Sequence, residues 1–291
     1  MSGPTCIWRT EAELGEGVRY DPASNEVWWV DILGQQIFCL NLSTGGKQTW
    51  PTPETVGCTF AARNGEVLAL FRRSVVRLDR SSGSFETVVE FADEPEQNRF
   101  NDGVVAPDGS LWVSSMDFDF TEPTGCLYRV AADLTIEKKA DGYIVANGPA
   151  FSADGRTMYV NETMKGEIHR FDHDPQIGSI SNKSLFVTFD EGDGLPDGIC
   201  VDANGDLWAA VVTGGCVRRY GPDGSMREAI KLPSPIVTSV GIGGENLDVL
   251  YVTTGRILME PDVLAAHPLS GSLFSISGAA PGTAPATFQI D

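Results

Sequence analysis

The chain has 291 residues, 42% of them hydrophobic, which is enough to bury a large core and argues against disorder. The net charge of −19 argues against nucleic acid or anionic membranes as partners, because so acidic a surface repels phosphate groups. No apolar run is long enough to span a bilayer, and residues 1–10 lack the basic and apolar regions of a signal peptide. We therefore expect a cytoplasmic protein without a membrane anchor.

Six short strand-like segments follow one another along the chain, and each is marked by a glycine. Consecutive marker glycines are 40 to 50 residues apart. Each marked segment is followed by a second β-rich run, such as "PDGSLWV" at 107–113, and by a third, such as "GCLYRVA" at 125–131. Hydrophobic residues alternate with a period of two in these runs. The marker glycines are Gly17, Gly57, Gly103, Gly148, Gly198 and Gly241.

A repeat of this length with up to four strands and no amphipathic helix is typical of a β-propeller blade. Six copies predict an all-β fold: a six-bladed β-propeller with four-stranded antiparallel blades around a central channel, formed as one domain by residues 1–291. Pairs such as Asn204–Gly205 lie between first and second strands and predict type I′ hairpin turns. One terminus is expected to supply the last outer strand, either "CIWRT" at 6–10 or "ATFQI" at 286–290.

The residue before each marker glycine is expected at one mouth of the channel, because the innermost strand of each blade lines that channel. Glu16, Asn147 and Asp197 carry oxygen donors that can converge there, and Asn101 lies beside Asp102. Carboxylate and amide oxygens suit a hard divalent cation, and buried carboxylates without one would repel each other. The alternative is a channel filled by hydrogen-bonded side chains. The full set is Glu16, Val56, Asp102, Asn147, Asp197 and Val240.

The histidines, cysteines and serines argue against other kinds of site. His169, His173 and His267 lie outside the strand starts, so a histidine-rich zinc site is disfavoured, and the first two are expected at the surface. The six cysteines form no CxxC motif and most lie in apolar runs, which predicts buried free thiols. No GxSxG motif is present, so a Ser-His-Asp mechanism has no support.

Four segments resemble successive signatures of the senescence-marker-protein/gluconolactonase family, which includes regucalcin and bacterial sugar lactonases. They are "LGEGVRYD", "NRFNDGVVAPDGSLWVSSM", "VANGPAFSADGRTMYV" and "LPDGICVDANGDLW". They occur in the family's order and spacing, and the resemblance covers essentially the full chain. In addition, "LMEPDVLAAHPLSGSLFSI" resembles the C-terminal segment of bacterial aldonolactonases, in which a short helix interrupts the last blade.

The resemblance implies a six-bladed propeller with one divalent metal near the top of the channel. The Glu, Asn and Asp that bind metal in the family fall on Glu16, Asn147 and Asp197. The ion could be Ca, Zn, Mn, Mg or Fe. Asp197 is also the candidate catalytic residue, which would orient or deprotonate the attacking water. A metal-bound carboxylate is a weak base, and a lowered water pKa would offset this weakness.

The family's substrate-binding Arg and Asn fall on Arg99 and Asn101 in "NRFNDG". The alternative role for Arg99 is that of a structural counter-charge to the two carboxylates. A further acidic substrate contact of the family would fall near Asp119, where a solvated acidic loop is the alternative. Asn161–Glu162 stand where the family commonly has an aspartate followed by Ser or Thr, a difference expected at the pocket wall.

These features predict a metal-dependent hydrolase that opens the ester ring of a sugar-acid lactone, such as xylono-, arabinono- or gluconolactone. One alternative is a propeller phosphotriesterase that uses the same metal against a phosphorus centre. Another is a non-catalytic propeller that binds a cation or a protein. The expected partner is a small-molecule lactone, and the expected oligomeric state is a monomer or a weak homo-oligomer.

Overall fold

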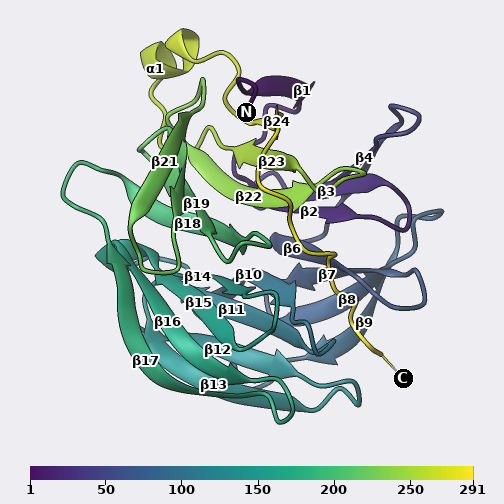
Figure 1. Cartoon of the computed structure of the whole chain (residues 1–291). Coiled ribbons are helices and arrows are strands. Elements are labelled where there is room, and N and C mark those ends of the chain that lie inside the picture. Colours follow the sequence, from purple (N-terminus) through teal and green to yellow (C-terminus); the bar gives the residue numbers. More distant parts are fainter. Residues whose placement is uncertain (291) are drawn as a thin grey trace.

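The structure, a computed structural model, describes residues 1–290 and consists almost entirely of strands (Figure 1). Its 24 strands form six four-stranded sheets, and the first strands of these sheets lie around a central channel. This arrangement confirms the predicted six-bladed β-propeller. No helix among the described residues is long and apolar enough to cross a membrane.

Five blades each use four consecutive strands, with the innermost strand first. Blade one contains β2 (Gly15–Asp21), β3 (Glu26–Asp31), β4 (Gln36–Asn41) and β5 (Lys47–Pro51). Blade two contains β6 (Val56–Ala61), β7 (Val67–Phe71), β8 (Ser74–Leu78) and β9 (Phe85–Glu90). Blade three contains β10 (Asn98–Val105), β11 (Leu111–Asp117), β12 (Gly125–Val130) and β13 (Ile136–Tyr143).

Blade four contains β14 (Ala146–Phe151), β15 (Thr157–Glu162), β16 (Glu167–Asp174) and β17 (Ser179–Thr188), with a 3-10 turn, η1 (Thr163–Lys165), after β15. Blade five contains β18 (Leu195–Val201), β19 (Leu207–Val212), β20 (Cys216–Tyr220) and β21 (Met226–Lys231). Blade six contains β22 (Val237–Gly243), β23 (Val249–Thr254), β24 (Ser272–Ser277) and the N-terminal strand β1 (Thr5–Arg9).

The N-terminal strand settles how the propeller closes. β1 pairs antiparallel with β24 as the outer strand of blade six, so "CIWRT" closes the ring. A short helix, α1 (Pro261–Ala266), lies between β23 and β24. The resemblance to aldonolactonases implied such a helix in the last blade, and the structure confirms it.

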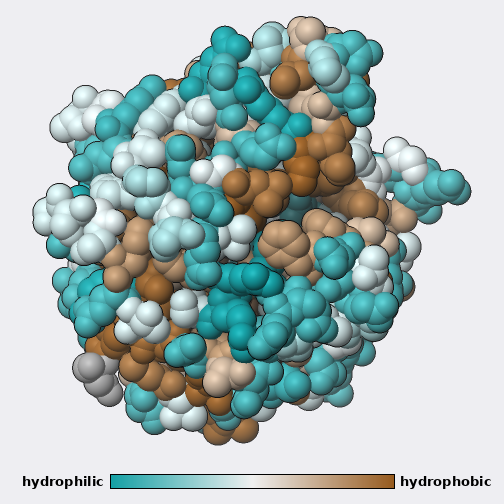
Figure 2. Space-filling view, turned by 180° about the vertical axis from the view of Figure 1, so that it is seen from behind, coloured by the Kyte–Doolittle hydropathy of each residue, from teal (hydrophilic) through white to brown (hydrophobic). Residues whose placement is uncertain are grey.

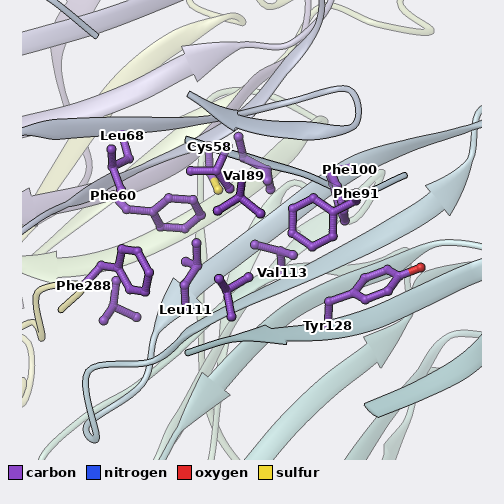
Figure 3. Packing of buried hydrophobic residues seen from close by; sticks show 14 of the residues in the cluster. Cys58, Phe60, Leu68, Val89, Phe91, Phe100, Leu111, Val113, Tyr128 and Phe288 are labelled. Carbon is purple, nitrogen blue, oxygen red and sulfur yellow. The ribbon is translucent and has the colours of Figure 1, made fainter. Parts of the chain in front are cut away.

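The C-terminal segment has a different place from an outer strand. Residues 279–290, which we call the C-terminal strap, run across the face of the propeller that is nearer in Figure 1. In blade five the backbone N–H of Ala203 donates to Pro281 O (2.8 Å), and the N–H of Phe288 donates to Ala61 O (2.8 Å) in blade two. The Phe288 side chain is fully buried in the hydrophobic cluster between blades two and three (Figure 3). The strap therefore links blades on opposite sides of the channel.

The turns between first and second strands differ from the predicted type. In the Asn204–Gly205 pair only the glycine has a positive φ, 81°, and its N–H donates to Asp202 O (3.0 Å). A type I′ turn would require positive φ at two central residues. The glycine is instead the fourth residue of the turn, where a left-handed conformation leads the chain back into the second strand. Gly65, Gly109 and Gly155 also have positive φ at the matching positions.

The expectation of a surface position for His173 is wrong. Its ring is buried between Trp112 and Phe151, with centroid distances of 5.5 and 4.9 Å, and its Nδ1 contacts the carbonyl oxygen of Gly155. The imidazole fills space between blades three and four as an aromatic ring would. The cysteines follow their prediction more closely, because all six are free and four are buried.

Candidate metal and substrate site

The predicted site residues lie at irregularities in the innermost strands. Strand pairing shifts register after Glu16 in β2, after Asn147 in β14 and after Pro196 in β18, and Asn101 is skipped in the pairing of β10. Such a bulge bends the strand and re-aims its side chains. Close packing of neighbouring blades also requires the marker glycines here. A Cβ on Gly198 would lie 2.8 Å from a backbone atom of β22 in blade six.

The structure brings five of the six predicted site residues into one polar cluster. Glu16, Asn147, Asp197, Arg99 and Asn101 come from four blades, and each is almost fully buried. The carboxyl groups of Glu16 and Asp197 interact directly. Asn147 Oδ1 accepts a hydrogen bond from Asn101 Nδ2 (2.7 Å), and Asn101 Oδ1 accepts one from Arg99 Nη1 (2.7 Å).

Negative charge in this cluster exceeds the nearby positive charge. Burial raises the pKa of Glu16 well above its ordinary range, and the charges of Asp197 and Asp102 raise it further. Burial also raises the pKa of Asp197, again with help from Asp102, and raises the pKa of Asp102 to about 6. Arg99 supplies one positive charge, although burial lowers its pKa to about 10. A bound cation would supply the remaining positive charge.

The donor set fits a hard divalent cation, since two carboxylates and one amide offer oxygen ligands only. Among residues 1–290, no three side chains of the His, Cys, Asp and Glu types are arranged so that they could hold a metal ion. Together with the amide of Asn147, Glu16 and Asp197 would offer three oxygen ligands. That these residues bind metal stays a prediction, whereas their juxtaposition is observed.

Arg99 lies beside the loop between β11 and β12. Its guanidinium carbon is 6.0 Å from the centre of the Phe118 ring, and Phe118 is 39% exposed. The neighbouring Asp119 is exposed on this loop. Its role as a substrate contact stays a prediction. Figure 2 shows the face away from the C-terminal strap, where hydrophobic side chains surround a hollow.

A cavity of about 450 Å³ occupies the channel on the strap side of these carboxyl groups. It is lined mainly by apolar side chains of the inner strands, such as Val18, Phe60 and Ile199, and by residues 283–286 of the C-terminal strap. Asp102 is also among its lining residues. This cavity lacks the converging oxygen donors of the polar cluster.

Comparison with known proteins decides the family. A model of the SMP-30/gluconolactonase/LRE-like region matches residues 14–256. The chain belongs to the SMP-30/gluconolactonase/LRE-like family. The predicted resemblance is thus confirmed over most of the propeller.

Relatives in this family include lactonases, which are carboxylic-ester hydrolases. L-arabinolactonase of Azospirillum brasilense is 34% identical over 290 residues, covering 98% of this chain and 95% of the relative. The 6-deoxy-6-sulfogluconolactonase of Pseudomonas putida is 33% identical over 286 residues, covering 97% of both chains. Among solved structures, a calcium-binding regucalcin from Agrobacterium tumefaciens has a TM-score of 0.94 at 26% identity, covering 99% of this chain and 97% of that one.

Asn161 and Glu162, which were expected at the pocket wall, end β15 in blade four. The Glu162 carboxylate accepts hydrogen bonds from the N–H groups of Ile144 (2.9 Å) and Val145 (3.3 Å). Asp31 accepts two equivalent bonds before the first strand of blade one, at 2.8 and 3.0 Å. Glu162 at the end of β15 thus holds the start of blade four as Asp31 at the end of β3 holds the start of blade one.

Thr163 is the functional candidate that sequence reasoning missed. Its hydroxyl accepts a hydrogen bond from Asn147 Nδ2 (2.8 Å) and donates one to Pro196 O (2.8 Å). No repeated pattern marks it, because Ile32 follows Asp31 at the matching place in blade one.

Proposed function

We propose that this protein is a metal-dependent hydrolase that opens the ester ring of a sugar-acid lactone such as xylono-, arabinono- or gluconolactone. The observation that carries the proposal is the meeting of two buried carboxyl groups, an amide oxygen and a guanidinium in one polar cluster. The proposal is supported by the family to which the chain belongs, because two relatives of the chain are sugar lactonases.

Glu16, Asn147 and Asp197 would hold the cation. When bound, a divalent cation would polarise the ester carbonyl and lower the pKa of a nearby water. The Asp197 carboxylate accepts a hydrogen bond from the attacking water and takes its proton as the water oxygen bonds to the carbonyl carbon. The bond from that carbon to the ring oxygen then breaks, and the ring oxygen takes the proton held by Asp197 to become a hydroxyl group. The product is a hydroxy acid.

Arg99 and Asn101 would position the substrate. Arg99 Nη1 already donates to Phe100 O (3.1 Å) and to Asn101 Oδ1 (2.7 Å). In the described part of the chain, no acceptor contacts the other two nitrogens of this guanidinium within hydrogen-bond distance. These donors are free to bind hydroxyl groups of a sugar lactone, which fixes the ester relative to Asp197.

The proposal is tested by measuring acid release from a panel of aldonolactones after removal of bound metal and addition of single divalent cations. We expect turnover of at least one sugar lactone, its loss with a chelator and its recovery with one cation. Turnover of a fluorophosphate without turnover of any lactone would favour the phosphotriesterase alternative. No turnover of either compound with any cation would favour the non-catalytic alternative.

Arg99→Ala is expected to raise KM for the lactone about 10- to 100-fold, because it removes charge-assisted hydrogen bonds to the substrate. The Kd for the divalent cation should stay within about threefold, since Arg99 is not among the predicted ligands. Steady-state kinetics and calorimetric metal titration of the same variant give both constants.

The matched control is Arg256→Ala. Arg256 follows β23, pairs with Glu11 (3.2 Å) and donates to Ser270 O (3.1 Å), away from the polar cluster. It should leave KM and metal affinity unchanged. If Arg99→Ala instead shifts metal affinity and Tm while KM stays constant, Arg99 is the counter-charge and not a substrate contact.

A further inference from the structure

A directed series of hydrogen bonds runs through the polar cluster from blade three to blade five. Arg99 Nη1 donates to Asn101 Oδ1 (2.7 Å), and Asn101 Nδ2 donates to Asn147 Oδ1 (2.7 Å). Asn147 Nδ2 donates to Thr163 Oγ1 (2.8 Å), and Thr163 Oγ1 donates to the carbonyl oxygen of Pro196 (2.8 Å). Pro196 directly precedes Asp197 in β18.

The two ends of this series fix the direction of every bond between them. A guanidinium can only donate hydrogen bonds, and a backbone carbonyl can only accept them. The single hydroxyl proton of Thr163 is used toward Pro196, so its oxygen faces Asn147 as an acceptor. It can therefore receive the NH₂ end of the Asn147 amide but not the oxygen end. The amide oxygen is left on the side of Asn101.

The orientation of this amide decides whether Asn147 can bind a cation. An amide oxygen has two lone pairs, so Oδ1 can accept from Asn101 and still ligate a metal, whereas the NH₂ end would repel one. Burial makes the hydroxyl hard to replace, because Asn147 is 3% and Thr163 7% exposed. Little water can reach the NH₂ group if the hydroxyl is removed.

We propose that Thr163 is a positioning residue for the metal site, which holds the oxygen of the Asn147 amide toward the channel axis. This inference rests on the proposed function of Glu16, Asn147 and Asp197 as ligands. It goes further by assigning a role to a side chain that touches neither the cation nor the substrate. Through Pro196 the same hydroxyl also ties the position of Asn147 to the strand that carries Asp197.

The test compares Thr163→Val and Thr163→Ser with the control Thr254→Val. Valine keeps the shape of threonine but cannot accept the bond from Asn147, whereas serine can. Thr254, at the end of β23 in blade six, also has a buried hydroxyl, which donates to Ser272 O (3.0 Å) and accepts from Ser272 N (3.0 Å). Its loss costs the same number of hydrogen bonds without involving Asn147.

We expect Thr163→Val to raise the Kd for the activating divalent cation about 10- to 100-fold, the range typical of lost outer-shell support. The Tm increase caused by saturating cation should shrink accordingly, and KM for the lactone at saturating cation should stay within about threefold. Thr163→Ser and Thr254→Val should keep the parent's metal affinity. Calorimetric titration and thermal unfolding measure these effects without reference to turnover.

Equal metal affinity in Thr163→Val and the parent would overturn the inference. So would equal weakening in Thr254→Val, because the effect would then come from general loss of stability. If Thr163→Val does not fold, Thr163→Ala replaces it. If neither variant folds while Thr254→Val does, Thr163 has a structural role and the proposed positioning role is contradicted. Failure of the proposed function is distinguishable, since the parent itself would then show no cation-dependent turnover.

Discussion

Asp197→Asn is expected to lower kcat/KM for the lactone by about 10²- to 10⁴-fold, the usual contribution of a positioned general base. Asparagine keeps the size of the side chain, so the fold should be unchanged. It removes the negative charge proposed to bind the cation and the group proposed to take the proton of the attacking water. Steady-state kinetics at saturating cation, with circular dichroism of the same preparation, measure both effects.

The same substitution should have the opposite effect on the stability of the metal-free protein. Burial raises the pKa of Asp197 in the folded protein, with Asp102 adding to the shift. A raised pKa means that the stability from this group is complete below about pH 4, its unfolded value, and is lost as the pH rises through the folded value. Asparagine does not ionise, so the variant avoids this loss. With a chelator at pH 8, we expect its Tm to be at least about 2 °C above that of the parent.

The control for both measurements is Asp262→Asn on helix α1. Asp262 is exposed and lies outside the polar cluster, so its replacement should change neither kcat/KM nor the pH dependence of Tm. An Asp197→Asn protein that binds the cation and turns over lactone like the parent would show that Asp197 is neither ligand nor base.

The fold and the centre of the site were predictable because both follow from one repeated feature. Most marker glycines lie where the innermost strands of neighbouring blades approach closely, as Gly57 does at the carbonyl oxygen of Asn101, 2.5 Å from where its Cβ would be. A steric requirement that recurs from blade to blade leaves a regular spacing in the sequence. Glu16, Asn147 and Asp197 directly precede such glycines. They therefore occupy the same position in the innermost strand of their blades.

Features that depend on contacts between distant segments left no such spacing. His173 follows the buried Phe171 by two residues in β16, but a hydropathy pattern treats histidine as polar and places it outside. Thr163 follows its strand, and its partners Asn147 and Pro196 lie 16 and 33 residues away. The turn at Asn204–Gly205 was located correctly, but its type depends on which residue takes the left-handed conformation.

The C-terminal strap is the clearest case of a role that only the structure could assign. "ATFQI" has the alternation of a strand, which made it a candidate outer strand of the last blade. β1 already occupies that edge. The strap instead makes an isolated parallel bridge between Phe288 and Ala62 in blade two. The alternation then serves to bury one aromatic ring rather than to extend a sheet.

Phe288→Ala is expected to reduce the free energy of unfolding by about 3–5 kcal/mol, the range for removing a buried phenylalanine. The ring is fully buried among side chains of blades two and three, including Phe60, Leu111 and Val113, so its loss leaves a cavity (Figure 3). The Tm should fall by on the order of 10 °C. Thermal unfolding followed by calorimetry or circular dichroism measures the change.

The neighbouring Thr287 is exposed, so Thr287→Ala should leave the Tm within about 1 °C of the parent. KM for the lactone should be unchanged in both variants at 25 °C, because the strap lies on the side of the channel away from Glu16 and Asp197. A parent-like Tm in Phe288→Ala would mean that the strap is not docked in solution. An altered KM with a parent-like Tm would instead mean that the strap shapes the site, and the polar cluster could not then be treated as independent of the far face of the propeller.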